Sequence, residues 1–375
     1  METNYSQHSH GQARANQAAQ PLLQAAGRDI ASAQRGTEGP ICVGDIGCSV
    51  GNNSVAELAI VLRCLDEQGC ADREVSITHV DQPGNHWDQL FTALASAPNG
   101  YRTVRVRGRR GPIFSYAMAQ DMYQQCFPSA YMHIVYSGKS SKTSWEGLIG
   151  ESLTCCRCWK AWDKCITMHW GSAAVNAPDH LIAQFSADPK AKQAAQQQGH
   201  SDLLRWLQLR AKELKPGGHL VVTAIGTQDE ASAGSLQQGY DIATAAWSRL
   251  VADGRITQQE FASTCFPTYF WMLDACIEVI REEMLDTFDI LRSSSGRASK
   301  TSSSRDSLSA EEVSEAAAAG MLAVLGPGLR QALAERSVAD QDKILHVFRQ
   351  ELSDHCLAAH FEFFTNYILL ALRRR

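Results

Sequence analysis

Short apolar runs alternate with longer stretches of helical periodicity over the first 230 residues of this chain. An apolar run starts at Ile41, passes through a glycine-punctuated turn and leads into an apolar helix over Ala56 to Leu65. Ser201 to Leu214 has helical periodicity and leads through Lys215-Pro-Gly-Gly218 into another strand. Strands alternating with helices predict an α/β fold, with a parallel sheet covered by helices on both faces. The further predicted strands are Val75 to Val80, His133 to Ser137, His219 to Ile225 and Asn366 to Arg373.

The two ends of the chain carry other patterns. Residues 1–40 are rich in Gln, Ala, Ser and His, and they predict a helix between Ala13 and Ala33 that Pro21 would start or kink. From about residue 231 to 365 the pattern is mostly helical. Ser293 to Ser309 interrupts it, and because nine of these seventeen residues are serine, a mobile loop is expected there. The predicted helices of this part are Asp241 to Val251, Leu273 to Leu291, Ala310 to Leu325 and Asp340 to Leu352.

These patterns predict one sizeable core with an appended lobe, which suits a chain of 375 residues with 44% apolar content. We expect the last strand to close the sheet of the core. The expected parts are an N-terminal lid segment (1–40), an α/β core (41–230, with residues 138–165 as an insertion), a helical cap (231–365, with the Ser-rich loop 293–309) and a closing strand (366–375).

The charge and the apolar runs exclude several classes of protein. The net charge of −5 argues against a dedicated nucleic-acid binder, which would show a basic excess. No apolar stretch approaches the ~20 residues that a membrane-spanning helix needs, and residues 1–20 lack the apolar segment of a secretory signal. We therefore expect no membrane partner and a cytoplasmic location, with the 12 cysteines as reduced thiols.

The glycine turn after the first strand is the first indication of chemistry. It contains Gly44, Gly47 and Gly51 but lacks the Gly-x-Gly-x-x-Gly spacing of a dinucleotide fold. Asp45, an acid inside the turn, suits a ligand with a cationic end and no phosphates, such as S-adenosylmethionine (SAM). Asp81, at the end of the second strand, would then accept hydrogen bonds from the ribose. A merely tight turn and an Asp81 that caps the following helix remain alternatives.

Six segments in a fixed order strengthen this interpretation. Together they resemble the SABATH family of SAM-dependent small-molecule carboxyl methyltransferases, and the resemblance covers nearly the whole chain. The segments are Tyr5-Ser-Gln-His-Ser-His-Gly-Gln12, Asp45-Ile-Gly-Cys-Ser-Val-Gly-Asn-Asn53, Asp81-Gln-Pro-Gly-Asn-His-Trp87, Asp121-Met-Tyr-Gln-Gln-Cys-Phe-Pro128, Met132-His-Ile-Val-Tyr-Ser137 and Ile166-Thr-Met-His-Trp-Gly-Ser172.

The resemblance implies a Rossmann-like SAM-binding sheet with a helical cap, often as a homodimer. It implies methyl transfer to the carboxylate of a small lipophilic acid, and some relatives methylate ring nitrogens instead. The residues that it implies for SAM are Tyr5, Ser9, Asp45, Gly47, Cys48, Asn53, Asp81 and Gln82, with Asp121 and Met122 near the adenine. For the acceptor it implies Gln12 and Trp170, which would hold the carboxylate, and His169, which would line the pocket.

The chemistry of the acceptor agrees with these residue types. A carboxylic acid with a pKa near ~4 is already ionised at neutral pH, so no general base is required. The indole N–H of Trp170 and the amide of Gln12 can hold a carboxylate without taking a proton. As alternatives, Trp170 could be a core aromatic residue, His169 a structural histidine, and Gln12, with Tyr5 and Ser9, part of a polar tail.

The chain departs from the family between Ser137 and Ile166, where about 28 residues separate two motifs that the family joins almost directly. A zinc site made of Cys155, Cys158, Cys165 and His169 is one explanation, and a plain surface insertion is another. A translated intron is a third, because Gly138-Lys-Ser and Cys155-Cys-Arg can be encoded by splice-donor and splice-acceptor consensus sequences.

Two smaller departures affect ligands. Ala262, Thr264 and Cys265 stand where some relatives bind magnesium, and they cannot replace a carboxylate, so no metal is expected. Gln82 would place a polar group against the adenine. Beside carboxyl methylation, three functions therefore remain open: N- or O-methylation of another small molecule, a SAM-binding pseudoenzyme and, more remotely, an NAD-dependent oxidoreductase.

Overall fold

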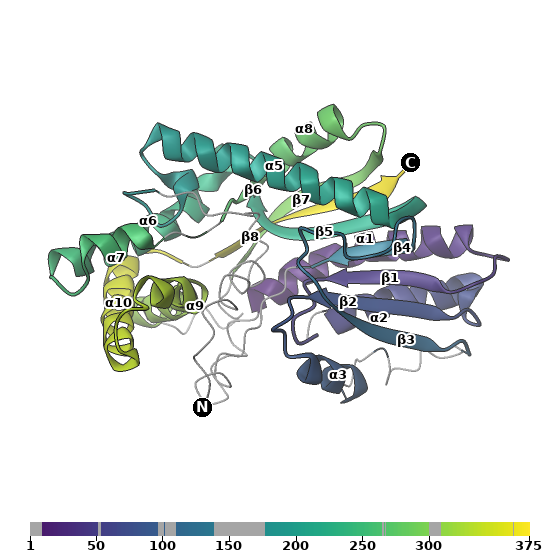
Figure 1. The fold of residues 1–375 in the computed structure, drawn as a ribbon, viewed down its shortest axis with the longest axis horizontal. Coiled ribbons are helices and arrows are strands. Elements are labelled where there is room, and N and C mark those ends of the chain that lie inside the picture. Colours follow the sequence, from purple (N-terminus) through teal and green to yellow (C-terminus); the bar gives the residue numbers. More distant parts are fainter. Residues whose placement is uncertain are drawn as a thin grey trace.

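The computed structural model shows a twisted sheet with helices on both faces and a group of helices beside one end of it (Figure 1). The residues that it describes are 10–51, 54–96, 101, 110–138, 177–264, 266, 268–299, 309–362 and 364–375.

The eight-stranded sheet has the order β3-β2-β1-β4-β5-β8-β7, and β6 pairs with β5 outside this row. The five strands β3, β2, β1, β4 and β5 run parallel to one another, whereas β8 is antiparallel to both β5 and β7. The α/β architecture predicted from the sequence is thus confirmed. The strands are β1 (Ile41–Ile46), β2 (Val75–Asp81), β3 (Ile113–Ala119), β4 (Met132–Ser137), β5 (Leu214–Thr227), β6 (Trp271–Met272), β7 (Phe288–Ser299) and β8 (Phe364–Arg374).

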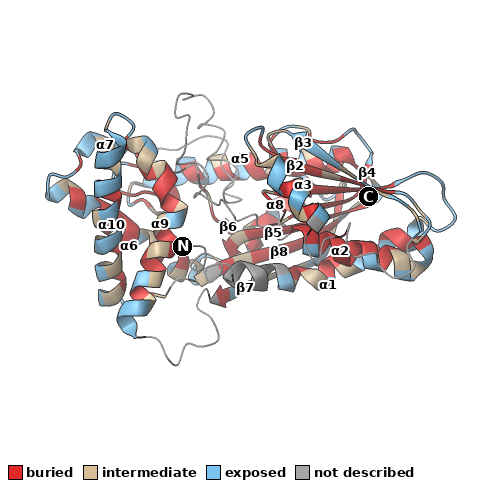
Figure 2. Ribbon diagram, turned by 90° about the horizontal axis from the view of Figure 1, so that it is seen from below, coloured by how far each residue is buried: buried red, intermediate tan, exposed pale blue. Residues whose placement is uncertain are grey.

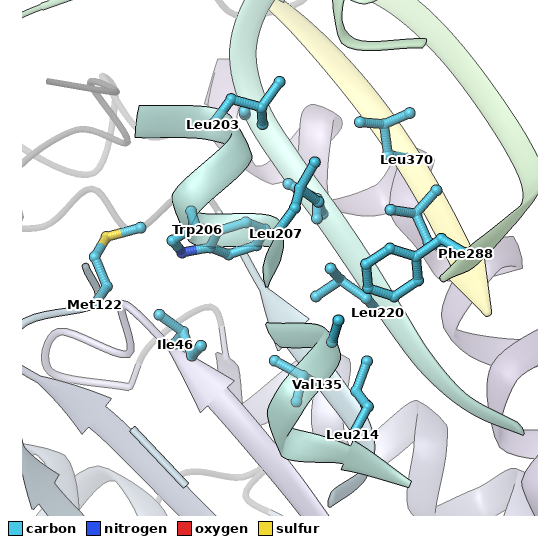
Figure 3. Close-up of a cluster of buried hydrophobic side chains, with 14 of the residues drawn as sticks. Ile46, Met122, Val135, Leu203, Trp206, Leu207, Leu214, Leu220, Phe288 and Leu370 are labelled. Atoms are coloured by element: carbon cyan, nitrogen blue, oxygen red, sulfur yellow. The ribbon is translucent and has the colours of Figure 1, made fainter. Parts of the chain in front are cut away.

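Alternating side chains of the strands serve two hydrophobic layers. In β1, Ile41 and Val43 join the layer under α1, α2 and α3, while Cys42 and Ile46 join the layer under α5 and α8. Figure 3 shows the second layer, in which Trp206 of α5 lies among side chains from the strands. The helices on the sheet are α1 (His10–Ala33), α2 (Ser54–Leu65), α3 (Trp87–Ser96), α5 (Pro189–Glu213) and α8 (Leu273–Glu283), with single helical turns at Asp66–Cys70, Ala183–Phe185 and Ala231–Ala233.

Helix α1 confirms the helix expected near the N-terminus, and it begins earlier than expected. Pro21 lies inside it rather than at its start. The face of α1 that carries Leu23 and Ala26 is buried against α2 and the sheet, so the helix is held by tertiary packing despite its proline.

In the part of the chain that the structure describes, the cap consists of the helices α6 (Gly234–Ala252), α7 (Gln258–Ser263), α9 (Ala310–Ala332) and α10 (Val338–Ala358). They bury an apolar cluster of their own, in which the Trp247 and Phe348 rings meet edge to face at 5.2 Å. Figure 2 shows the cap beside the sheet, with buried residues on the facing sides of its helices. Among the described residues, no helix has the length and hydropathy to span a membrane.

The structure corrects the prediction for the Ser-rich segment. Residues 288–299 form strand β7, so the first part of the expected loop 293–309 is wrong; residues 300–308 lie outside the described residues. The helix expected over Leu273 to Leu291 ends at Glu283. The physical reason is that β8 offers β7 backbone partners from Phe288 opposite Arg374 to Ser299 opposite Phe364, with one irregularity between Ile290 and Arg292. This pairing overrides the weak strand propensity of serine.

The last strand is also placed differently from the prediction. β8 does not close the sheet, because it lies between β5 and β7, and β7 is the edge strand. The segment from α8 to β7 contributes to the core beneath the sheet, through Cys276, Ile280 and Phe288, although the sequence assigned it to the cap.

Candidate functional site

The carboxyl ends of β1, β2 and β4 meet where the strand order reverses. β1 lies between β2 and β4. The chain continues from β1 to β2 and β3 on one side, and then to β4 and β5 on the other side of β1. In open parallel sheets, ligands bind outside the strand ends at such a switch point. The glycine turn that follows β1 therefore lies at the position expected for a small-molecule site.

Backbone geometry explains the glycines of this turn. Gly47 and Gly51 have φ values of 80° and 85°, in the region that disfavours other residues. The Gly47 amide donates to the carbonyl of Val80 at 2.8 Å, which ties the turn to β2. A Cβ atom on Gly51 would lie 2.6 Å from Leu90 of α3, so any side chain there would clash.

Asp81 joins the second strand to this turn. Its Oδ2 accepts a hydrogen bond from the Ser49 amide at 2.7 Å, and its Oδ1 accepts one from the Gln82 amide at 2.8 Å. The Cys48 Sγ lies 4.0 Å from Oδ2. Asp81 thus holds the turn after β1 against β2, which is a different role from capping the helix that follows, since α3 begins only at Trp87.

Asp45 is buried within a chain of polar side chains. Its Oδ2 lies 2.7 Å from Nδ1 of His79, whose Nε2 lies 2.7 Å from the Tyr101 hydroxyl, and that hydroxyl lies 3.1 Å from Oγ of Ser115. One arrangement of protons satisfies this series of hydrogen bonds: the His79 Nδ1–H donates to the Asp45 carboxylate, and the Tyr101 O–H donates to Nε2 of His79. These contacts fix the orientation of the Asp45 carboxylate beside the turn.

A metal ion was not expected from the sequence, yet Asp45, Cys48 and His79 place possible ligand atoms within 4.8 Å of one another. Both ring nitrogens of His79 already have hydrogen-bond partners, Asp45 and Tyr101. We therefore interpret these side chains as a hydrogen-bonded cluster rather than as a metal site.

Thr264 is one of the residues from which no metal binding was expected. Its hydroxyl accepts a hydrogen bond from the Trp247 indole N–H and donates one to the Glu260 carbonyl, which gives Thr264 a packing role.

Asp121 and Met122 follow β3 in the β3–β4 loop, residues 120–131. The Gln120 amide donates to the carbonyl of Asp81 at 2.9 Å, so the start of this loop lies against the end of β2. Asp121 accepts from the Tyr123 amide at 2.9 Å, and Met122 is buried beneath the sheet. Asp45, Asp81 and Asp121 thus lie in or after three parallel strands, toward the carboxyl ends on the same side of the sheet.

The remaining candidate residues cannot be placed in the same way. Gln12 lies in the first turn of α1, and its side chain is outside the description. The acceptor contacts and the three explanations of the insertion therefore stay predictions. The residues outside the described ranges are Tyr5, Ser9, Asn53, His169, Trp170, and the insertion after Gly138.

An aromatic group lies where the sheet meets the cap. The rings of Phe185, Tyr240 and Phe270 pack at centroid distances of 5.0 to 6.1 Å. Burial raises the pKa of Tyr240 far above its ordinary value, so its hydroxyl stays protonated. Beside them, Nε2 of His180 lies 3.0 Å from Asp241 of α6, so this apolar surface has a polar end.

Sequence reasoning missed His79 and the buried pair Arg210–Glu213. The signal for His79 was a polar side chain inside the apolar strand Val75 to Val80. Arg210 and Glu213 fall on the buried stripe of α5 that also carries Leu203, Trp206 and Leu207. A charge on an apolar stripe is a reason to expect a buried partner.

Comparison with known proteins agrees with this geometry. A model of the family described as SAM dependent carboxyl methyltransferase matches residues 1–375. The 3,7-dimethylxanthine N-methyltransferase TCS1 of Camellia sinensis var. assamica is 24% identical over 294 residues, 77% of this chain and 73% of that protein. Anthranilate O-methyltransferase 3 of Zea mays is 24% identical over 282 residues, 72% of this chain and 68% of that protein.

One solved structure has the same fold. The structure described as loganic acid methyltransferase with SAH (S-adenosylhomocysteine) superposes with a TM-score of 0.70 at 17% identity. The match covers 99% of this chain and 96% of that one. Both the sheet and the cap are therefore part of an arrangement already seen in another protein.

Proposed function

Because the chain belongs to the family of SAM dependent carboxyl methyltransferases, we propose that it transfers a methyl group from SAM to the carboxylate of a small lipophilic organic acid. The products are the methyl ester and SAH. The observation that carries the proposal is the family match over residues 1–375, which includes the cap as well as the sheet. SAM as the methyl donor and the transferase class follow from that membership.

The residues at the strand ends fit such a cofactor. The segment 41–51, which is β1 with the turn after it, and the segment 75–87 contain no Lys or Arg, but they contain the buried carboxylates of Asp45 and Asp81. This set of side chains suits a ligand that carries positive charge and ribose hydroxyls, and it does not suit a pyrophosphate. When bound, SAM supplies an electrophilic methyl group on a sulfonium.

We assign the roles of the chain as follows. Asp81 accepts hydrogen bonds from the ribose while its backbone contacts keep it in place. Asp45, oriented by His79, faces the amino-acid end of the cofactor, and the β3–β4 loop lies beside the adenine. Tyr5, Ser9, Gly47, Cys48, Asn53 and Gln82 complete these contacts.

The acceptor carboxylate needs to be oriented and desolvated, but it does not need to be deprotonated. Gln12 and Trp170 donate hydrogen bonds to the acceptor carboxylate, which is already ionised, and His169 lines its site. Placing a carboxylate oxygen in line with the methyl group can supply ~7–11 kcal/mol of the barrier reduction. The half-buried Phe185 and Tyr240, which pack on the buried Phe270, suit a lipophilic acceptor, because their rings are partly exposed near the cap.

The test combines binding with turnover. SAM and SAH should each raise the melting temperature, and transfer of a labelled methyl group to one of a panel of small acids should give a product that mild alkali hydrolyses. The same titration on a variant without residues 138–165 separates the effect of the insertion. No stabilisation by SAM or SAH in either form would contradict the proposal.

Methylation of a ring nitrogen is the second candidate, because one relative with similar coverage is named a xanthine N-methyltransferase. Its product would resist alkali, which distinguishes it from an ester. Binding of SAH without turnover on any acceptor would instead support a pseudoenzyme. The cytoplasmic location and the homodimer stay predictions, which cell fractionation and light scattering test.

A further inference from the structure

The β3–β4 loop crosses between two strands without a helix of its own. The backbone groups of such a segment have no ladder to pair with, and buried ones need other partners. The C-terminal end of α5 provides them. The amides of Ala130 and Tyr131 donate to the carbonyls of Lys212 and Glu213, each at 2.9 Å.

Arg210 binds the first half of the loop. Its Nη1 donates to the carbonyl of Met122 and its Nη2 to the carbonyl of Gln124, both at 3.0 Å. The guanidinium also lies 5.3 Å from the ring centre of Trp206. Arg210 has no exposed surface, so these contacts are made away from water.

Glu213 binds the second half of the loop. Its Oε1 accepts hydrogen bonds from the amides of Cys126 and Phe127. The same carboxylate receives two bonds from Arg210, from Nε at 2.7 Å and from Nη2 at 2.9 Å. One fully buried ion pair therefore satisfies four backbone groups of the loop.

A contribution to stability does not by itself explain why this buried ion pair is present. Desolvating two charges is costly, and a buried ion pair can often be replaced by apolar residues of similar volume without loss of stability. What apolar residues cannot replace is the set of hydrogen bonds to the loop. The loop is also packed tightly from the other side, because a Cβ atom on Gly44 of β1 would lie 2.6 Å from the Phe127 ring.

We propose that Arg210 and Glu213 are positioning residues for the adenine end of the cofactor. By holding the carbonyl of Met122 and the amides of Cys126 and Phe127, they keep the β3–β4 loop in the conformation that receives the adenine beside Asp121. The inference rests on the proposed function, since it concerns the SAM site of this chain.

The test compares SAH binding in three proteins by calorimetry. In the double variant Arg210→Met/Glu213→Met the apolar stripe of α5 is continuous and the loop loses its four bonds. We expect the dissociation constant for SAH to rise about tenfold or more, the size of effect that losing a well-formed hydrogen bond or two produces. Hydrogen–deuterium exchange in residues 120–131 should rise at the same time.

The cap offers a matched control. Arg336 and Glu260 form the same two-bond pairing, far from the loop in sequence and partly exposed. The variant Arg336→Met/Glu260→Met removes the same kind of ion pair from the cap. It should leave SAH binding within about twofold of the unchanged protein, because this pair makes none of the hydrogen bonds to the β3–β4 loop that Arg210 and Glu213 make.

Each outcome decides the inference. Equal SAH binding in all three proteins would overturn it, and so would weakened binding with unchanged exchange in the loop. No SAH binding by the unchanged protein would overturn the proposed function as well. If the double variant does not fold, Arg210→Lys replaces it: one ammonium cannot reach the carboxylate and both carbonyls together, so weaker SAH binding in a folded protein is again expected.

Discussion

Two Arg–Glu pairs among the described residues have the same chemistry and very different surroundings. Arg210 and Glu213 have no exposed surface, and their remaining hydrogen-bonding groups go to a loop at the candidate cofactor site. The side chains of Arg336 and Glu260 are 30% and 17% exposed, and Glu260 also completes the capping box of α7 with Thr257.

This difference shows what decides the effect of an ion pair. In the cap, the apolar cluster around Trp247 and Phe348 carries the packing, and the pair is partly exposed. Beneath the sheet, the pair replaces apolar residues on the buried stripe of α5. Burial therefore makes one pair essential for the arrangement of a loop, whereas solvent screening makes the other a small contribution to stability.

The largest expected effect comes from breaking the buried pair on one side only. Arg210→Met leaves the Glu213 carboxylate buried without its cation and should lower the free energy of unfolding by about 3–5 kcal/mol. Urea unfolding measures this loss, and adding Glu213→Met should recover only part of it, because the unpaired charge is removed but the loop's backbone groups still lack their partners. A loss below about 1 kcal/mol would mean that water reaches Glu213 in the folded protein.

A methyl group at Gly44 tests the packing of the loop against β1. Gly44→Ala should cost about 1–3 kcal/mol of unfolding free energy, because its Cβ would meet the Phe127 ring at 2.6 Å. Phe127→Leu in the same chain should relieve part of the cost. If Gly44→Ala alone were neutral in thermal and urea unfolding, the loop would not be held closely against the strand.

A shape change in the cap should affect stability but not the cofactor site. Phe348→Leu removes the edge-to-face contact with Trp247 at 5.2 Å and should lower the unfolding free energy by about 1–2 kcal/mol. The dissociation constant for SAH, measured below the melting temperature, should stay unchanged. A parallel weakening of SAH binding would show that the cap and the cofactor site are coupled.

The smallest effect is the pH dependence of the exposed pair. Hydrogen bonds from Arg336 lower the pKa of Glu260 to about 2, below its value of about 4.3 in an unfolded chain. The pair's contribution is therefore complete above pH ~4.3 and is lost as the pH falls toward 2. With both side chains partly exposed, it should amount to about 1 kcal/mol or less.

Comparing the unchanged protein with Glu260→Gln measures this term. The difference in unfolding free energy should be largest near neutral pH and shrink steadily below pH ~4. A difference that is the same at pH 7 and pH 2.5 would mean that lost packing or capping, rather than lost charge, accounts for the effect.

Sequence patterns predicted most of the parallel part of the sheet, since β1, β2, β4 and β5 are short apolar runs with clear turn signals. They missed β3, in which Phe114, Tyr116 and Met118 occupy every second position but are exposed, and they missed β7, whose residues were assigned to a helix and a loop. Of the candidate site, the order of the motifs indicated Asp45, Asp81 and Asp121. It gave no sign of the contacts that orient them, because those come from residues distant in the chain.

What the sequence by itself determined is the local chemistry: which turns need glycine, which strand ends carry acids, and in what order the family's motifs occur. Only the tertiary structure decided whether Ser293 to Ser299 is a loop or a strand, because the answer depends on the backbone partners that β8 brings beside it. It likewise decided that Arg210 is buried, since a guanidinium is stable there only with the Glu213 carboxylate and the loop carbonyls in reach. Hydrogen-bond partners distant in the sequence are set by packing, and packing is a property of the folded chain.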